Sequence, residues 1–338
     1  MRFSNVSIAA VTHVDAPIRI TSDELEAPLA STYARLGMPT RLLEPLTGVR
    51  ARRWWPPSTQ PSDGAALAGN KLLDESGVDR GRVGILVNTS VCRDWVEPST
   101  ACFVHHKLGL SEDCLNFDVA NACLGFLDGM QIVANLVERG EVDYGLVVDA
   151  ESSRHVVEQT LERLRQPSCD GVMMKEQLAT LTVGSGAAAM LLARSDLAPQ
   201  GHRFLGAVST AATQHNQLCR GQLEFGITDT KSLLQYGVAV AQRTWQRAQE
   251  AFGWTINSVD HFAMHQVSEL HTQTLASTIG FPLDKAFLVY PELGNVGPAS
   301  IPIVLSKASL AERYAPGDRI VLAGIGSGLN CTAAAVVW

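Results

Sequence analysis

Residues 116–131, NFDVANACLGFLDGMQ, join a short apolar run to a helical pattern. The run over residues 115–119 stops at Asn-Ala-Cys, and from Leu124 to Gly140 apolar residues recur at near-helical spacing. This pattern predicts a strand that feeds a helix through a tight turn, with Cys123 at the helix entrance. Free N–H groups and the partial positive charge of a helix N-terminus lower the pKa of a thiol. Cys123 is therefore a candidate nucleophile, and the alternative is a small buried residue that fills a tight turn.

The two halves of the chain carry a faint internal repeat. Three pairs of segments match in the same order: VGILVNTS (83–90) with HFAMHQVS (261–268), NACLGFLDGMQIVANLVERGEVDYGLVV (121–148) with PASIPIVLSKASLAERYAPGDRIVLAGI (298–325), and LTVGSGAAAM (181–190) with AGIGSGLNCTAAAV (323–336). Such a repeat predicts a duplicated α/β unit in which two sheets enclose buried helices.

The length of 338 residues allows two core-forming units. We predict an N-terminal half over 1–195 and a C-terminal half over 196–338. Polar helical periodicity over about 150–178 predicts an inserted cap in the first half. Residues 233–254 predict a helix in a second covering segment, and residues 1–17 predict a strand rather than a signal peptide.

The repeat also shows where the halves differ. Cys123 aligns with Ser300, whereas the position of Val87 in the first half is occupied by His265 in the second. Asn295 lies in the loop before the matching helix, between two glycines. A thiol, an imidazole and a neutral amide donor suit acyl transfer through a thioester. The plainer alternatives are a core histidine and a turn asparagine.

The glycine-rich segment GIGSGLN (324–330) does not have the spacing of a phosphate-binding loop. Glycines also allow the backbone to approach a reacting carbonyl closely. We therefore expect the backbone N–H of Ser327 to act as an oxyanion donor beside the N–H of Cys123.

Composition excludes several functional classes. A net charge of −7 without a basic stripe argues against nucleic acid, and no apolar stretch is long enough for a membrane span. Seven scattered cysteines without a CxxC pair predict neither a disulfide framework nor a zinc site, and they suit a reducing cytoplasm. Cys102 and His105 could face a metal, but no second ligand pair accompanies them. We expect no metal and no cofactor.

At nearly full length, the chain resembles the thiolase-superfamily condensing enzymes of the ketoacyl synthase III type. The matching motifs are TGVRARR (47–53), DVANACLGF (118–126), FAMHQVS (262–268), GNVGPASIP (294–302) and the C-terminal GIGSGLNCTAAAVVW. The resemblance implies a five-layer αβαβα fold and a Cys–His–Asn site. It also implies that Cys123 carries an acyl group. His265 and Asn295 would bind the carbonyl oxygen of the second substrate, and the backbone N–H groups of Cys123 and Ser327 would bind the carbonyl oxygen of the first substrate.

Several motifs depart from ketoacyl synthase III. The histidine motif reads HQVS and is followed by Glu269, and Leu46 replaces the arginine that often precedes the Thr-Gly turn. The coenzyme A contacts of that family therefore cannot be carried over. Three arginines remain candidates for the coenzyme A phosphates, although surface arginines are common. They are Arg52, Arg53 and Arg220.

Glu97 in RDWVEPSTA (93–101) is a further departure, because synthase III places an apolar residue there. A synthase that decarboxylates malonyl carrier needs no base, whereas joining two plain acyl thioesters requires removal of an α-proton. The whole pattern looks most like the OleA family, which condenses two fatty acyl-CoAs to a 2-alkyl-3-ketoacid at the start of olefin biosynthesis. The resemblance implies a homodimer in which Glu97 acts on the partner's site, with downstream olefin-pathway enzymes as possible partners.

Four alternatives stay open at this point. Ketosynthases that join β-ketoacyl chains into α-pyrones, condensing subunits of heterodimeric β-lactone pathways and malonyl-dependent synthase III all resemble this chain. A non-catalytic acyl-CoA-binding subunit is the fourth, and it would be expected to lack one of Cys123, His265 and Asn295. A cleaving thiolase would carry a second cysteine inside the glycine-rich loop, whereas Cys331 follows that loop and is predicted to be a core residue.

Overall fold

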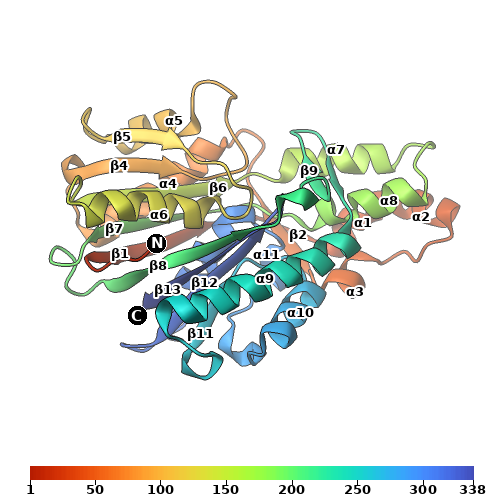
Figure 1. The fold of residues 1–338 in the computed structure, drawn as a ribbon. Coiled ribbons are helices and arrows are strands. Elements are labelled where there is room, and N and C mark those ends of the chain that lie inside the picture. The colour runs from red at the N-terminus through yellow and green to blue at the C-terminus, as the bar shows by residue number, and fades with distance from the viewer.

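The computed structural model describes residues 1–338, which are built around one mixed sheet of nine strands in the order β11-β12-β13-β8-β1-β7-β6-β4-β5 (Figure 1). The strands are β1 (Val6–Asp15), β4 (Val83–Asn88), β5 (Leu115–Asp118), β6 (Tyr144–Glu151), β7 (Gly186–Arg194), β8 (His202–Ala211), β11 (His261–Met264), β12 (Arg319–Gly326) and β13 (Asn330–Val337). The predicted N-terminal strand is confirmed as β1, and the apolar run before Cys123 is β5.

The sheet consists of two halves with the same topology. In the first half β4 runs parallel to β6, β6 pairs antiparallel with β7, and β7 pairs antiparallel with β1. In the second half β11, β12, β13 and β8 repeat these three relations in the same order. The duplicated unit is therefore confirmed. The two halves of the sheet join where Ser7 and Ile8 of β1 pair with Arg203 and His202 of β8.

Two helices, α6 (Gly125–Glu138) and α12 (Ser300–Leu310), form the layer between the half-sheets. The largest hydrophobic core contains apolar side chains of both helices together with inward-facing residues of β4, β6, β7, β8, β11, β12 and β13. Each fully buried Leu or Val contributes roughly 1.5–3 kcal/mol relative to exposure. Because protein encloses these helices on both faces, their sequences are apolar around most of the circumference.

The outer faces of the half-sheets are also covered by helices. α4 (Pro61–Ser76) and α5 (Thr100–Leu108) pack on the first half, and α9 (Thr230–Phe252) and α10 (Glu269–Ile279) pack on the second (Figure 1). The arrangement gives the five layers that were predicted. The predicted helix over 233–254 is confirmed as α9. No helix combines the length and the hydropathy that crossing a bilayer would require.

A helical lobe lies beside the sheet layers, at the right of Figure 1. It contains α1 (Ser22–Glu26), α2 (Ala30–Leu36), α3 (Leu43–Thr47), α7 (Arg154–Leu164) and α8 (Gly171–Gln177), which share a hydrophobic cluster of their own. The segment expected as a cap over about 150–178 forms α7 and α8, although β6 extends to Glu151. We retain 1–195 and 196–338 as a proposed division into halves.

The remaining elements are short. They are β2 (Ile18–Thr21) paired with β3 (Ala51–Trp54), β9 (Cys219–Gly221) paired with β10 (Gly226–Thr228), and α11 (Tyr290–Leu293). α11 leads directly into the turn that holds Asn295, so this short helix helps to place a predicted site residue.

Candidate active site

Cys123 lies in a strained turn between β5 and α6. Ala122, the residue before it, has φ 46°, a left-handed conformation that costs a non-glycine residue roughly 1 kcal/mol. Two short-range hydrogen bonds close the turn, from Leu124 N to Asn121 O at 3.0 Å and from Gly125 N to Ala122 O at 3.1 Å. The predicted strand, turn and helix are therefore confirmed, and Cys123 lies two residues before the first residue of α6.

Gly125 lets this turn pack tightly against the neighbouring strand. A Cβ at position 125 would lie 2.5 Å from the carbonyl oxygen of Thr89, which follows β4. No side chain fits at that distance. The glycine at the start of α6 therefore sets how closely Cys123 approaches the loop after β4.

The electrostatic environment of the Cys123 thiol differs from our prediction. Burial raises its pKa to about 12, and Cys219 and Glu151 act in the same direction. We predicted a lowered pKa from the helix N-terminus, and this prediction is wrong because loss of solvation outweighs the helix charge. The resting thiol is neutral, so attack on a thioester requires removal of its proton.

His265 and Asn295 lie side by side, as the sequence predicted. The Nε2 atom of His265 is 3.0 Å from Oδ1 of Asn295, and this oxygen also accepts the backbone N–H of Gly297 at 2.9 Å. Because an amide oxygen only accepts, Nε2 carries the ring proton. Burial lowers the pKa of His265, which keeps the ring neutral. The amide NH₂ of Asn295 forms no hydrogen bond within the protein and can donate to a carbonyl oxygen.

Two glycines hold Asn295 in place. Its backbone N–H donates to Thr182 O at 3.0 Å, and its carbonyl accepts the N–H of Gly184 at 2.8 Å. Gly294 has φ 65°, and a Cβ there would lie 2.2 Å from Thr182 O. Only glycine satisfies both the backbone conformation and the close contact. Asn295 is therefore a turn asparagine, as the alternative interpretation of the sequence predicted, and it also faces the candidate site.

Glycines of the C-terminal motif bring the two halves of the site together. A Cβ on Gly324 would lie 2.9 Å from a methyl of Leu124 and 3.6 Å from Cβ of His265. A Cβ on Gly326 would lie 3.1 Å from Asn121 O, so the turn carrying the half-buried Ser327 packs against the entrance of α6. The segments of Cys123, His265 and Ser327 therefore converge, as predicted.

An apolar pocket extends from His265 between α9, α10 and the second half-sheet. Its walls include Trp245, Phe262, Leu275 and Phe281, and Cys331 lines it as well, consistent with its prediction as a core residue. This pocket was not predicted from the sequence. Its residues come from five separate segments, so no local pattern marks them.

The pocket holds a second histidine that the sequence analysis missed. Burial, together with the nearby His265, lowers the pKa of His271 to about 4, and its Nδ1 atom has no hydrogen-bond partner. His271 is placed by the start of α10, where Ser268 caps the helix by accepting the His271 backbone N–H. Its position one helical turn after a serine cap was the only available signal.

Glu97 occupies the exposed loop between β4 and α5 and precedes a cis peptide bond to Pro98. Its side chain makes no hydrogen bond within the protomer. Three apolar residues of the same loop are also exposed, Val91 by 56%, Trp95 by 66% and Val96 by 94%. A single protomer therefore leaves Glu97 at the surface beside an apolar patch.

The three candidate arginines have different surroundings. Arg52 is fully buried and donates to Ser22 Oγ at 3.1 Å, so it cannot meet a phosphate at the surface, and its prediction as a coenzyme A contact is wrong. Arg53 is half-buried, with an Nε atom enclosed in the protein. Arg220 on β9 is exposed and forms no ion pair, so it remains the candidate of the three that is free to bind a phosphate.

Two buried carboxylates at the end of β6 were not foreseen. Burial raises the pKa of Glu151 to about 7, and its oxygens accept the backbone N–H groups of Val91 at 2.7 Å and Cys92 at 3.3 Å. Burial and Glu151 also raise the pKa of Asp149, which accepts the hydroxyl of Thr89 at 2.6 Å. Both groups hold the loop that carries Glu97, and their position in a fully buried strand conceals this role in the sequence.

Comparison with known proteins places the chain in a family. Residues 117–212 match the 3-oxoacyl-[acyl-carrier-protein] synthase III family, and residues 249–338 match its C-terminal domain. The chain is 48% identical to the acyl-CoA:acyl-CoA alkyltransferase of Xanthomonas campestris pv. campestris and 38% identical to that of Shewanella oneidensis. In both cases the alignment covers 100% of both chains.

A crystal structure of Xanthomonas campestris OleA with bound cerulenin superposes with a TM-score of 0.98, at 48% identity, over 100% of this chain and 98% of that one. Other structures of that protein carry substitutions of a glutamate, a cysteine and a histidine. The spacing of those three residues along the sequence is the spacing of Glu97, Cys123 and His265 here. The chain therefore belongs to the OleA family of acyl-CoA:acyl-CoA alkyltransferases, which are acyltransferases of the ketoacyl synthase III type.

Proposed function

We propose that this enzyme joins two long-chain fatty acyl-CoA thioesters by a non-decarboxylative Claisen condensation. The product would be a 2-alkyl-3-ketoacid, and the reaction would be the first step of long-chain olefin biosynthesis. The observation that carries the proposal is the convergence of the Cys123, His265 and Asn295 segments, next to an apolar pocket that begins at His265. The names of the two similar alkyltransferases support it.

The first half-reaction forms an acyl-enzyme. The Cys123 sulfur attacks the carbonyl of the first acyl-CoA, the carbon–sulfur bond to coenzyme A breaks, and the thiol proton leaves with the coenzyme A sulfur. Backbone N–H groups of Cys123 and Ser327 would stabilise the negative oxygen that forms on the way. Since the resting thiol is neutral, the neutral ring of His265 is the proposed transient acceptor for its proton.

The second half-reaction forms the carbon–carbon bond. A base removes a proton from the α-carbon of the second acyl-CoA, and the resulting enolate oxygen would accept a hydrogen bond from the amide NH₂ of Asn295 and, once its N–H turns away from Asn295 Oδ1, one from His265 Nε2. The α-carbon then attacks the Cys123 thioester, which releases the thiol. Hydrolysis of the remaining coenzyme A ester by water gives the ketoacid. Every step uses side chains and substrates, so we expect no cofactor.

Glu97 is the proposed base, and it would act across a homodimer. Within one protomer its carboxylate is exposed and unpaired, beside exposed Val91, Trp95 and Val96. An apolar patch around a charged group suits burial against a second subunit, where Glu97 of the partner subunit would enter the site. Arg220 is the remaining candidate for a coenzyme A phosphate. We expect the enzyme to work in the cytoplasm, with downstream olefin-pathway enzymes as possible partners.

The first test supplies myristoyl-CoA alone, without a malonyl donor. We expect release of free coenzyme A and, in the organic extract, a coupled ketoacid or its decarboxylated ketone, identified by mass spectrometry. An acylated Cys123 without coupled product would overturn the proposed second substrate. Malonyl and β-ketoacyl thioesters would then be supplied, to distinguish synthase III activity from α-pyrone formation.

The role of Glu97 is tested by separating the two half-reactions. Glu97→Gln should become acylated at Cys123 and should release one equivalent of coenzyme A without coupled product. Mixed dimers of Glu97→Ala and Cys123→Ala subunits should recover part of the activity, because one of their two sites contains both groups. Condensation by Glu97→Gln at the wild-type rate would remove Glu97 from the mechanism. Verified mixed dimers without activity would contradict the arrangement across the dimer.

A further inference from the structure

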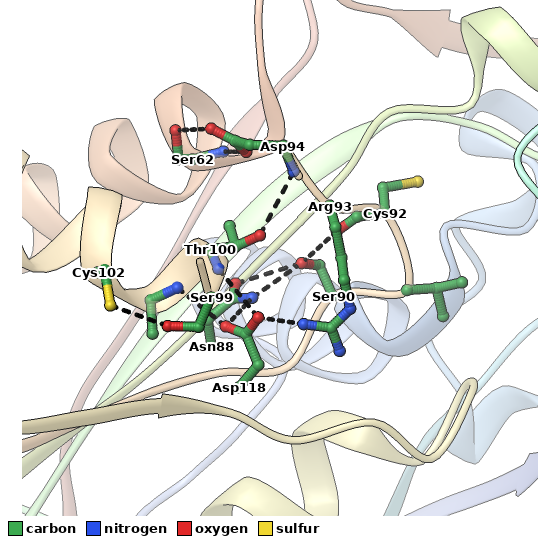
Figure 2. Close-up of polar contacts among 12 residues, drawn as sticks. Ser62, Asn88, Ser90, Cys92, Arg93, Asp94, Ser99, Thr100, Cys102 and Asp118 are labelled. Carbon is green, nitrogen blue, oxygen red and sulfur yellow. Dashed lines mark hydrogen bonds and ion pairs between the residues drawn. The ribbon is translucent and has the colours of Figure 1, made fainter. Parts of the chain in front are cut away.

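The loop of residues 89–99, which carries Glu97, is held by buried carboxylates at the ends of two strands. Glu151, at the end of β6, accepts two backbone N–H groups at the start of the loop. Asp118, at the end of β5, binds the middle of the loop and its exit into α5, as Figure 2 shows. Asp118 has no role in the chemistry described above.

Asp118 directs every hydrogen bond of its carboxylate toward the loop and the elements that flank it. Its side chain is 9% exposed and pairs with the guanidinium of Arg93. The same carboxylate accepts the backbone N–H groups of Thr100 at 2.9 Å and Ala101 at 2.9 Å, and the amide of Asn88 at 3.0 Å. The loop is thus tied at its start, middle and end to one carboxylate.

Arg93 carries this link into the part of the loop before Glu97. Its side chain is 27% exposed and reaches Asp118 from within the loop (Figure 2). The next residue, Asp94, fixes the loop a second time by accepting the backbone N–H of Ser62 at the start of α4, at 2.8 Å. Charge-assisted hydrogen bonds with several donors give geometric precision as well as attraction. Arg93 and Asp94 therefore limit the movement of the segment that presents Glu97.

We propose that Asp118 is a positioning residue for Glu97, and that in the dimer it serves the active site of the partner subunit. The proposal rests on the proposed function, in which Glu97 is the base. A base on an exposed loop needs such support, because displacement of a reacting group by about 1 Å can lower a rate on the order of 100-fold. Asp118 would supply this support without touching either substrate.

The chain position of Asp118 suggests a competing role, because Cys123 follows it by only a few residues. The contacts decide against that role. All four hydrogen-bond donors to the carboxylate belong to residues 88–101, and none belongs to the turn that holds Cys123. Asp118 is therefore expected to affect proton removal in the partner's site and not acylation in its own.

The first experiment separates the half-reactions of Asp118→Asn. Acylation of Cys123, followed as the burst of coenzyme A from one acyl-CoA, should stay within about twofold of wild type, while condensation should fall on the order of 10- to 100-fold. Equal losses in acylation and condensation would overturn the proposal.

Mixed dimers show which site Asp118 serves. Consider a dimer of one Asp118→Asn subunit and one Cys123→Ala subunit. The Asp118→Asn subunit keeps an intact Cys123, and the Cys123→Ala subunit supplies an intact Glu97 loop to that site. It should recover activity to the same extent as the dimer of Glu97→Ala and Cys123→Ala subunits. Recovery in the second dimer but not in the first would mean that Asp118 serves its own Cys123, which would overturn the proposal.

Two further variants serve as a substitute for Asp118→Asn and as a control. Arg93→Met removes only the pairing inside the loop and leaves the backbone N–H groups that donate to Asp118 in place, so it replaces Asp118→Asn if that variant does not fold. It should show the same split between acylation and condensation. Asp143→Asn is the matched control. The carboxylate of Asp143 also forms ion pairs with arginines, Arg82 and Arg194, but it lies just before β6 begins. Both half-reactions should stay at wild-type rates in this control.

Failures of the two proposals are distinguishable. If Glu97→Gln condenses at the wild-type rate, the assignment of the base fails, and the inference about Asp118 falls with it. If Glu97→Gln is inactive in condensation while Asp118→Asn and Arg93→Met condense at the wild-type rate, only the inference about Asp118 is overturned.

Discussion

The two helices of the central layer begin in different ways, although the repeat aligns them residue by residue. Before α6, Ala122 has φ 46° and is followed by the partly accessible Cys123. Before α12, Ala299 has φ −64° and is followed by the fully buried Ser300, whose hydroxyl accepts the N–H of Gln266 at 3.3 Å. At this aligned position, the first half has Cys123, the proposed nucleophile, and the second half has Ser300, which supports the segment next to His265.

The strand ends show the complementary difference. Val87 near the end of β4 is a fully buried core residue, whereas the aligned position after β11 carries His265. In the proposed mechanism, each half therefore uses one of the two positions for packing and the other for chemistry. Duplication supplied two equivalent frameworks, and the site exists because their substitutions are asymmetric.

The largest expected effect is that of removing the nucleophile from the first helix entrance. Cys123→Ser should lower acyl transfer on the order of 10³-fold or more, since a hydroxyl without a strong base is a much weaker nucleophile. Acyl-enzyme formation is measured by intact-protein mass spectrometry. Ser300→Ala, the same position in the other half, is the control and should still be acylated. Normal turnover by Cys123→Ser would remove Cys123 from the mechanism.

The second prediction concerns the reactivity of the Cys123 thiol. The helix N-terminus would lower the pKa of this thiol, whereas burial raises it. With a pKa raised to about 12, alkylation of Cys123 by iodoacetamide should accelerate about tenfold per unit between about pH 7 and about pH 9. Peptide mass spectrometry separates Cys123 from the other cysteines, and the exposed Cys102 serves as an internal reference. A rate that levels off near pH 7 would show that the helix N-terminus dominates.

A smaller effect is expected from glycine at the two aligned alanines. Ala122→Gly relieves a left-handed conformation, so the free energy of unfolding should stay level or rise by about 0.5 kcal/mol. Ala299→Gly loosens a helical conformation and should lower the free energy of unfolding by about 0.5–1 kcal/mol. Urea denaturation of both variants measures the difference. Equal destabilisation would mean that the strain at Ala122 has no energetic consequence.

The smallest effect concerns the seam between the halves, where His202 of β8 pairs with Ile8 and its ring stacks on Trp338 at 3.5 Å. Burial lowers the pKa of His202 from 6.5 to about 4. The unfolded chain therefore binds the proton more readily, and the stability present above pH 6.5 is lost as the pH falls toward 4. His202→Phe should reduce this loss by on the order of 1 kcal/mol.

Denaturation curves of the wild type and His202→Phe at both ends of that pH range measure the difference. Phenylalanine keeps the stacking on Trp338 and removes only the titrating group. An identical pH dependence in the two proteins would show that protonation of His202 does not weaken the seam.

Much of the fold could be predicted from local pattern. The strand, turn and helix around Cys123 follow from apolar spacing, and the duplicated topology follows from matched segments in a common order. The repeat marked His265 as a position where the halves differ, and the resemblance to ketoacyl synthase III implied that His265 and Asn295 act together. Each of these features depends on residues that are close in the chain or equivalent in the repeat.

The features that were missed depend on residues far apart in the chain. Arg52 lies in a motif with a second arginine, and nothing in that motif indicates that its guanidinium is fully buried. Glu151 belongs to an apolar strand, and only folding places it under the loop that carries Glu97. The apolar pocket beside His265 is assembled from α9, α10 and three strands, so its lining has no signature in sequence order.

The sequence by itself determined the architecture, because hydrophobic periodicity and the internal repeat are properties of the chain, and its motifs indicated Cys123, His265 and Asn295 as the candidate nucleophile and its two partners. Tertiary structure decided the protonation state of Cys123, the unavailability of Arg52 and the anchoring of the Glu97 loop by Asp118. Those properties depend on desolvation and on hydrogen bonds between distant segments. Neither exists until the half-sheets enclose the central helices.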